Sequence, residues 1–226
     1  MSLQGAVIAF DLDGTLVDTA ADLVGSANAV LVQDGLEAIP FDDGRRMIGD
    51  GVRALVERAF TAAGRPLDDG PLDAMVGRFI EVYRGRIAEE SRLYPGVIET
   101  LDHLRAEGAR LAICTNKHTD LSIALTDALG LTPHFEVVAG SDLVARKPDP
   151  RLLRYAIERA GGSDRRALFV GDSMVDQKTA RAAGVPVVGF TCGYTPAPLK
   201  AADFDALIDR FEALPPIAER LIGRAP

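Results

Sequence analysis

The stretch Ala6-Val7-Ile8-Ala9-Phe10-Asp11-Leu12-Asp13-Gly14-Thr15 decides the fold. Its first five residues are all apolar, which is typical of a strand buried on both faces of a parallel sheet. Two carboxylates, Asp11 and Asp13, follow at once. Because ligands of open α/β sheets bind at the carboxyl ends of the strands, this change from apolar to acidic predicts a functional site where the strand ends.

The sequence from about Val17 to Arg92 has a different pattern. Apolar residues recur there at spacings of three and four, while Gly and Pro separate the segments. This pattern predicts three helices: Ala20–Asp34, Val52–Ala63 and Leu72–Glu90. No strand is expected in this region. We therefore expect an all-helical insert, with hinges near Thr15–Asp18 and Arg92–Gly96.

After Tyr94-Pro95-Gly96 the chain alternates between helix and strand patterns. The expected helices are Val97–Glu107, Leu121–Leu129, Pro150–Ala160, Val175–Ala183 and, near the end, Pro216–Ile222. The expected strands are Arg110–Cys114, Phe135–Ala139, Ala167–Val170, Pro186–Phe190 and a short one near Ala206–Ile208. Repeated strand–helix units predict an α/β fold with a doubly wound parallel sheet. Residues 1–16 and 93–226 would form this core, and residues 17–92 the helical insert.

Composition narrows the function classes. The 226 residues carry 25 Lys and Arg against 33 Asp and Glu, a net charge of −8 without any basic run, which argues against nucleic-acid or membrane-surface partners. The two cysteines, Cys114 and Cys192, lack CxxC spacing and indicate a reducing compartment. No signal segment or membrane-span-length apolar stretch is recognised, so we expect a cytoplasmic protein.

Polar residues follow several of the predicted strands. They are Asp11 and Asp13, Thr115 and Asn116, Lys147 after a longer loop, and Asp172 with Asp176. Carboxylates that converge at one sheet edge raise one another's pKa values unless a cation lies between them. Oxygen ligands without His or Cys partners favour Mg²⁺. The predicted cofactor is therefore Mg²⁺, with Asp11, Asp13, Asp172 and Asp176 as the metal-binding residues.

These residue types allow a division of labour in phosphoryl transfer. Asp11 can attack phosphorus and form an aspartyl-phosphate. Asp13 can protonate the leaving oxygen and then activate water. Thr115 can donate a hydrogen bond to a phosphoryl oxygen, and Lys147 can offset the charge that builds on the phosphate. Gly14 lets the backbone bend close to the phosphate.

Asp172 and Asp176 complete this arrangement. Asp172 would coordinate Mg²⁺ directly. Asp176, about one helical turn later, could hold a metal-bound water or orient Lys147. Ser173, between them, is expected to cap a helix rather than to act as a nucleophile.

Four segments in this order resemble the motifs of the haloacid dehalogenase superfamily. They are Phe10-Asp11-Leu12-Asp13-Gly14-Thr15-Leu16-Val17-Asp18, Thr115-Asn116, Lys147-Pro148 and Gly171-Asp172-Ser173-Met174-Val175-Asp176. The resemblance implies a Rossmann-like core, an α-helical cap formed by the insert, and contact of the Asp13 backbone carbonyl with the metal. The dehalogenases themselves lack the second aspartate of the first motif, so Asp13 favours phosphoryl chemistry.

Within this superfamily the sequence is most similar to phosphoglycolate phosphatases. The similar segments are Met47-Ile48-Gly49-Asp50-Gly51, Tyr94-Pro95-Gly96-Val97, Cys114-Thr115-Asn116-Lys117 and Gly193-Tyr194; Thr195-Pro196 departs from the expected polar loop. The resemblance implies hydrolysis of 2-phosphoglycolate. The expected assembly is a monomer or a homodimer. Phosphatases of sugar phosphates, nucleotides or pyrophosphate, and β-phosphoglucomutase-like phosphomutases, share most of these residues. A non-catalytic phosphate-binding module is a third, weaker reading.

The insert offers a place for the rest of the substrate. Gly49 and Gly51 immediately precede a predicted helix, whose free N–H groups suit an anion such as the carboxylate of phosphoglycolate. Arg53 would add positive charge, whereas Asp50 opposes it. With Gly14, Thr15 and Asn116, these residues form the predicted contacts to a small phosphorylated metabolite. Arg53→Ala is expected to raise KM more for a carboxylated substrate than for p-nitrophenyl phosphate.

Overall fold

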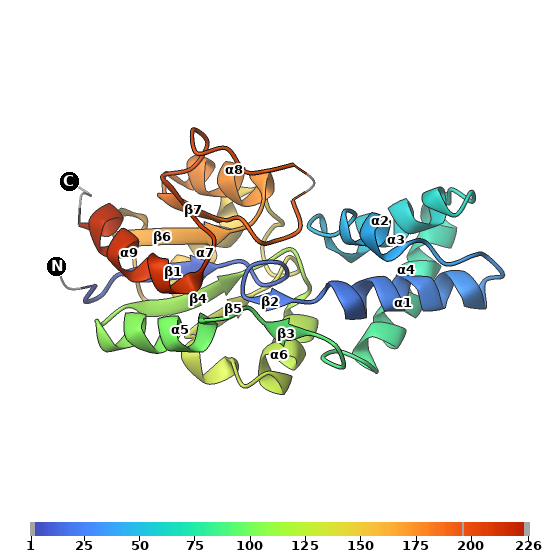
Figure 1. Ribbon diagram of the computed structural model, residues 1–226, viewed down its shortest axis with the longest axis horizontal. Coiled ribbons are helices and arrows are strands. Elements are labelled where there is room, and N and C mark those ends of the chain that lie inside the picture. Colours follow the sequence, from blue (N-terminus) through green and yellow to red (C-terminus); the bar gives the residue numbers. More distant parts are fainter. Residues whose placement is uncertain (1–2, 196, 224–226) are drawn as a thin grey trace.

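The computed structural model describes residues 3–195 and 197–223. Its centre is a parallel sheet of six strands in the order β5-β4-β1-β6-β7-β8 (Figure 1). The strands are β1 Val7–Phe10, β4 Arg110–Cys114, β5 Val137–Ala139, β6 Ala167–Gly171, β7 Val187–Phe190 and β8 Ala206–Ile208. Strand β1 lies between β4 and β6, so its carboxyl end is at the middle of the sheet edge. The predicted α/β fold is confirmed.

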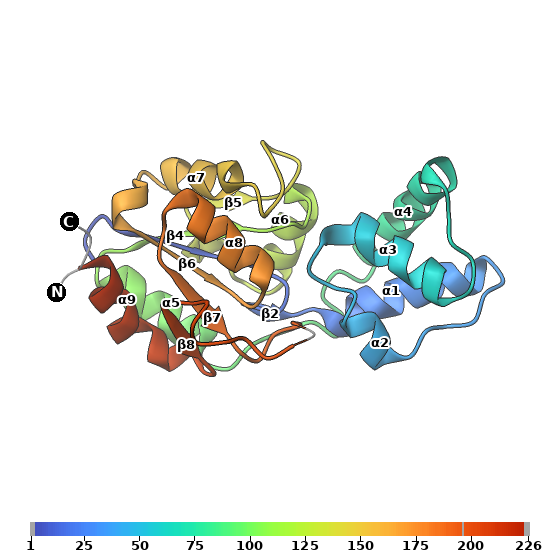
Figure 2. The same cartoon turned by 90° about the horizontal axis from the view of Figure 1, so that it is seen from above.

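Helices cover both faces of the sheet (Figure 2). Helices α5 (Val97–Ala106) and α9 (Leu214–Ile222) pack on one face, and α7 (Pro150–Arg159) and α8 (Met174–Ala183) on the other. Side chains of β1 alternate between these two layers because successive strand residues point to opposite faces. Ile8 and Phe10 join the cluster of α5 and α9, whereas Val7 and Ala9 join that of α7 and α8. This two-sided burial explains why the strand is wholly apolar.

A group of helices lies beside the carboxyl end of the sheet (Figures 1 and 2). It consists of α1 Ala20–Gln33, α2 Phe41–Arg45, α3 Gly51–Ala62 and α4 Asp69–Arg84. These helices share their own hydrophobic cluster, in which the rings of Phe79 and Tyr83 stack with centroids 5.8 Å apart. Helix α6 (Thr119–Ala128) of the core contributes Leu121 to the same cluster. The helical group thus packs against the core through shared apolar contacts.

Two short strands form where the chain enters and leaves the helical group. Strand β2 (Val17–Asp18) pairs antiparallel with β3 (Arg92–Leu93). The expectation that no strand lies in this region is therefore wrong, because two residues are too few to show the alternation by which strands are recognised. The pairing brings both crossings side by side at the places where hinges were predicted.

Several element boundaries also differ from the predicted ones. Helix α4 begins at Asp69, because Pro71 is tolerated in the first turn, where its missing N–H has no helical partner. It ends at Arg84 rather than Glu90. Beyond the helix, the N–H groups of Glu90 and Ser91 donate to the buried Asp22 carboxylate. Short helices missed by the periodicity are α2 and the 3₁₀ turns Thr132–His134, Asp164–Arg166 and Phe211–Ala213.

Candidate active site

The Asp11 carboxylate lies directly beyond β1 and is paired with a buried lysine. The N–H of Asp11 donates to the Val170 carbonyl at 2.9 Å, which continues the sheet hydrogen bonding to the end of β6. Lys147 Nζ lies 2.9 Å from Asp11 Oδ1 and 2.6 Å from Asp176 Oδ1. Burial alone would lower the pKa of Lys147, but Asp11 and Asp176 raise it overall, so the lysine is charged. One ammonium group therefore bridges residues from the first and fourth motifs.

The carboxylates of Asp11, Asp172 and Asp176 form a compact group. Each offers an oxygen atom, and these atoms lie within 4.8 Å of one another. Burial, with the neighbouring carboxylates, raises the pKa of Asp11 to about 6 and that of Asp172 to about 8, against the opposing effect of Lys147. A divalent cation would remove this penalty on the charged forms, and an all-oxygen ligand set suits a hard cation. The residues therefore fit a divalent metal.

Asp172 is held on both of its carboxylate oxygens. Thr15 Oγ1 donates to Oδ1 at 3.2 Å, and the Tyr194 N–H donates to Oδ2 at 2.7 Å. A Cβ at Gly14, where φ is +82°, would lie only 2.6 Å from Asp172 Oδ2. Gly14 and Thr15 were predicted as substrate contacts. In the structure both pack against the Asp172 carboxylate.

Asp176 is engaged within its own helix as well as with Lys147. Its Oδ2 accepts hydrogen bonds from the Ser173 N–H at 3.1 Å and the Ser173 hydroxyl at 2.6 Å, and Ser173 in turn caps α8. The predicted capping role of Ser173 is confirmed. The Oδ1 atom of Asp176 accepts a hydrogen bond from Lys147 Nζ at 2.6 Å.

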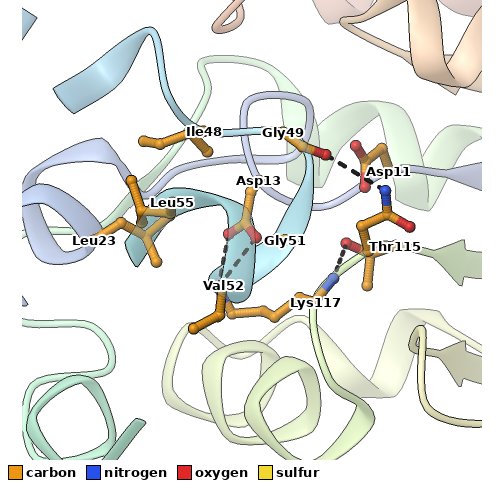
Figure 3. Close-up of a pocket in the computed structure, with 11 residues that line it drawn as sticks. Asp11, Asp13, Leu23, Ile48, Gly49, Gly51, Val52, Leu55, Thr115 and Lys117 are labelled. Atoms are coloured by element: carbon orange, nitrogen blue, oxygen red, sulfur yellow. Dashed lines mark hydrogen bonds and ion pairs between the residues drawn. The ribbon is translucent and has the colours of Figure 1, made fainter. Parts of the chain in front are cut away.

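Asp13 faces the helical group rather than the carboxylate cluster (Figure 3). Its side chain is not among the metal-binding group found in the described residues. Lys117 Nζ lies 3.0 and 3.1 Å from the two Asp13 oxygens, and Thr19 Oγ1 donates to Asp13 Oδ1 at 2.8 Å. Burial would lower the pKa of Lys117, but Asp13 and Tyr83 raise it overall. Sequence reasoning noted Lys117 only as part of a similar segment and assigned it no role.

Asn116 joins the second and third motifs. Its Oδ1 accepts the Lys147 N–H at 2.8 Å, and its Nδ2 donates to the Lys147 carbonyl at 3.2 Å. Nδ2 also lies 3.5 Å from the Gly49 carbonyl of the helical group. Thr115, the preceding residue, is buried and accepts a hydrogen bond from the Lys117 N–H at 3.2 Å. Asn116 therefore fixes the backbone that carries Lys147, besides any contact with substrate.

A small pocket of about 30 Å³, partly open to solvent, lies between the sheet edge and the helical group. Its core side is lined by Asp11, Asp13, Thr115, Asn116 and Lys117, and its other side by Leu23, Ile48, Gly49, Gly51, Val52 and Leu55 (Figure 3). At Gly51, where φ is +80°, a Cβ would lie 3.1 Å from the Asn116 carbonyl oxygen. Glycine there lets the start of α3 approach the second motif closely.

Arg53 lies elsewhere on the helical group. Its guanidinium pairs with Asp69 at 2.6 Å and with Asp73, both on α4, and its side chain is 39% exposed. It is not among the residues that line the pocket. The structure thus gives no support to a substrate contact by Arg53, and Lys117 supplies positive charge in the pocket instead.

Comparison with known proteins identifies the family. The family model described as haloacid dehalogenase-like hydrolase matches residues 8–190. The chain belongs to this hydrolase family. It is 51% identical to a phosphoglycolate phosphatase from Caulobacter vibrioides over 99% of this chain and 95% of that protein. The predicted superfamily membership is confirmed.

Solved structures share the fold of this chain. The crystal structure of a predicted phosphoglycolate phosphatase from Haemophilus somnus 129PT has a TM-score of 0.87 and 34% identity, covering 96% of this chain and 99% of that one. CbbY from Rhodobacter sphaeroides, in complex with phosphate, has a TM-score of 0.79 and 25% identity, covering 95% and 97%. The hydrolase described here is thus an enzyme of the phosphoric monoester hydrolase class. None of its described helices has the length and apolar character needed to span a bilayer.

Proposed function

We propose that this hydrolase is a Mg²⁺-dependent phosphatase that converts 2-phosphoglycolate to glycolate and phosphate through an aspartyl-phosphate on Asp11. The observation that carries the proposal is the buried group of Asp11, Lys147, Asp172 and Asp176 beneath a small pocket. Full-length similarity to a protein named phosphoglycolate phosphatase supports the choice of substrate.

The first half-reaction transfers the phosphoryl group to the enzyme. An Asp11 carboxylate oxygen attacks phosphorus, the bond from phosphorus to the ester oxygen breaks, and the leaving alkoxide takes a proton from Asp13. Lys147 stays within 2.9 Å of Asp11 and offsets negative charge on the phosphoryl oxygens. Thr115, at the pocket wall beside Asp11, donates a hydrogen bond to one of them.

The second half-reaction releases phosphate. Asp13, now a carboxylate, takes a proton from water, and the water oxygen attacks phosphorus while the bond to Asp11 breaks. Asp11, Asp172 and Asp176, with the Asp13 carbonyl, would hold Mg²⁺, which supplies charge neutralisation for the phosphoryl oxygens. Asp13 is thus restored to its protonated form, and Asp11 to a free carboxylate.

The carboxylate of the substrate would bind at the cap side of the pocket. Helix α3 begins at Gly51, and no side chain caps its free N–H groups. Lys117 is the cation among the described residues that line the pocket. A helix N-terminus and a buried ammonium group together suit a second anion. Binding there leaves the phosphoryl end facing Asp11, and the apolar lining by Leu23 and Leu55 disfavours bulky polar substrates.

The helical group would act as a lid. We keep residues 17–92 as the proposed cap domain, with residues 1–16 and 93–226 as the core. The paired strands β2 and β3 join the two parts, so a few backbone rotations there would open the pocket. A lid of this kind excludes water during phosphoryl transfer.

A phosphate-release screen tests the proposal. The substrates are 2-phosphoglycolate, sugar phosphates, nucleotides and pyrophosphate, each with Mg²⁺ and with a chelator. We expect the highest kcat/KM for 2-phosphoglycolate and no release with the chelator. Preference for a sugar phosphate or a nucleotide would contradict the substrate assignment, and sugar-phosphate isomerisation with little phosphate release would indicate a phosphomutase.

A further inference from the structure

The Tyr194 hydroxyl lies at the point where the chain enters the cap. It accepts hydrogen bonds from the N–H groups of Thr19 and Ala20, the latter at 3.0 Å, and it donates to Asp18 Oδ1 at 2.8 Å. These N–H groups belong to the start of α1, where no helical carbonyl is available to them. Tyr194 therefore caps the first cap helix from outside that helix, across 174 residues of sequence.

The backbone of the same tyrosine holds a proposed metal ligand. Its N–H donates to Asp172 Oδ2 at 2.7 Å. The packing around this bond leaves no free space, since a Cβ at Gly193 would lie 2.2 Å from Asp172 Oδ2 and one at Gly14 would lie 2.8 Å from Tyr194 Cδ2. In both Figure 1 and Figure 2 the loop after β7 extends from the core toward the helical group. Tyr194 thus binds the start of α1 through its hydroxyl and Asp172 through its backbone N–H.

The neighbourhood of Tyr194 makes these bonds hard to replace with water. Tyr194 is 4% exposed and Thr19 is fully buried. The Arg45 guanidinium of α2 lies over the Tyr194 ring, 5.3 Å from its centroid. Thr19 also donates through its hydroxyl to Asp13 at 2.8 Å. A shift of α1 relative to the core would therefore disturb contacts to both Asp13 and Asp172.

We propose that Tyr194 is a positioning residue that couples the attachment of the cap to the orientation of Asp172. The inference rests on the proposed metal site. Coupling between two sites is reciprocal, so Mg²⁺ binding at Asp172 must stabilise the hinge as much as an ordered hinge favours Mg²⁺. The bridge runs from the α1 N–H groups through the phenol and the backbone of Tyr194 to the carboxylate.

Tyr194→Phe tests this bridge. The variant keeps the ring beneath Arg45 and the N–H that binds Asp172. It removes the phenol acceptor of the Thr19 N–H and leaves the Ala20 N–H only its longer contact with Asp18 Oδ1, at 3.3 Å. Amide hydrogen exchange in a peptide covering Asp18–Leu23 is measured with and without Mg²⁺, and Mg²⁺ affinity is measured by calorimetry. In the parent protein we expect Mg²⁺ to slow this exchange. In the variant we expect the response to disappear and Mg²⁺ affinity to fall about tenfold.

Controls separate coupling from general loosening. Tyr155→Phe removes the hydroxyl of a partly buried tyrosine on α7, away from the hinge, and should behave as the parent does. Asp18→Ala keeps the phenol but removes the carboxylate that accepts from the phenol and from the Ala20 N–H. It is the second test of the bridge, needed where Tyr194→Phe does not fold, and it should weaken the Mg²⁺ response in the same direction.

The outcomes are distinct. If Mg²⁺ slows amide exchange equally in the parent, Tyr194→Phe and Asp18→Ala, the coupling is overturned while the metal site remains intact. A parent protein that does not bind Mg²⁺ would overturn the metal site and, with it, this inference. Loss of the response in Tyr194→Phe, with the response retained in Tyr155→Phe, would support the coupling.

Discussion

The Lys117 ammonium group lies 3.0 and 3.1 Å from the two carboxylate oxygens of Asp13, in a pocket that both side chains line. The lysine is almost fully buried and also lies over the Tyr83 ring of the cap, 4.5 Å from its centroid. The positive charge among the described residues that line the pocket therefore comes from the segment of the second motif, beside the proposed general acid, while the helical group contributes an apolar wall and a helix N-terminus.

Lys117→Met should reduce the preference of the enzyme for a substrate that carries a carboxylate over one that lacks it. A charged hydrogen bond contributes about 1.5–3 kcal/mol, so we expect kcat/KM for 2-phosphoglycolate to fall roughly 10- to 100-fold more than kcat/KM for ethyl phosphate. Steady-state phosphate release measures both. The effect on ethyl phosphate reports the disturbance of Asp13 alone. Arg53→Ala is the control and should change both substrates equally; the same factor for both in Lys117→Met would contradict the assignment.

Gly14→Ala should abolish tight Mg²⁺ binding, because the new methyl group would lie 2.6 Å from Asp172 Oδ2. Gly35→Ala is a matched control: φ is +78° there, close to the +82° of Gly14, but no atom lies within 4 Å of the added carbon. Both variants should lose about 1–2 kcal/mol of unfolding free energy through backbone strain. Calorimetric Mg²⁺ affinity that is equal in the two variants would count against the packing around Asp172.

The pH dependence of stability follows from the two raised pKa values. Burial raises the folded-state pKa of Asp11 to about 6 and that of Asp172 to about 8, both above the ordinary 3.8. Their stabilising effect on the metal-free protein is therefore complete at low pH and is lost as the pH rises through these values.

Mg²⁺ must displace those protons, so it should raise the thermal unfolding midpoint more at about pH 8 than at about pH 6. Unfolding scans with chelator and with Mg²⁺ across this range measure the difference. Asp172→Asn should remove most of it. An Mg²⁺-induced shift that does not vary with pH in the parent protein would be inconsistent with protonated carboxyl groups in the metal-free site.

Asp22→Ala should destabilise the segment at Glu90 and Ser91, where the chain passes from the helical group back to the sheet. The Asp22 carboxylate is fully buried and accepts hydrogen bonds from the Glu90 N–H at 3.1 Å, the Ser91 N–H at 2.8 Å and the Ser91 hydroxyl at 2.6 Å. Its loss should cost roughly 3 kcal/mol of unfolding free energy and speed proteolysis at Arg86 and Arg92. Asp120→Ala, which breaks an exposed ion pair with Arg84, should cost at most about 1 kcal/mol. Similar losses in both variants would argue against a special role for Asp22.

Much of the core geometry could be predicted from the sequence because the topology of parallel sheets is restrictive. Residues that follow different strands, such as Asp11 and Asp172, meet at one edge whatever the length of chain between them. The structure brings these two carboxylates together with Lys147 and Asp176, as expected.

Other features depend on distances that no local pattern encodes. Periodicity placed Arg53 near the start of a helix but did not show that Asp69 and Asp73 of the next helix would pair with it. The partner of Lys117 lies 104 residues away in the sequence, at Asp13. Strands β2 and β3 have only two residues each, so their pairing depends on the hinge geometry rather than on their own side chains.

The central claim is that Asp11 carries the phosphoryl group between the two half-reactions. The most direct measurement mixes the enzyme and Mg²⁺ with labelled 2-phosphoglycolate, stops the reaction with acid at successive times within one turnover, and analyses the peptides by mass spectrometry. We predict a phosphoryl group on the peptide containing Asp11 that appears before free phosphate, and none in Asp11→Asn. If phosphate is released at every time point while the peptide containing Asp11 never carries a phosphoryl group, the mechanism is contradicted.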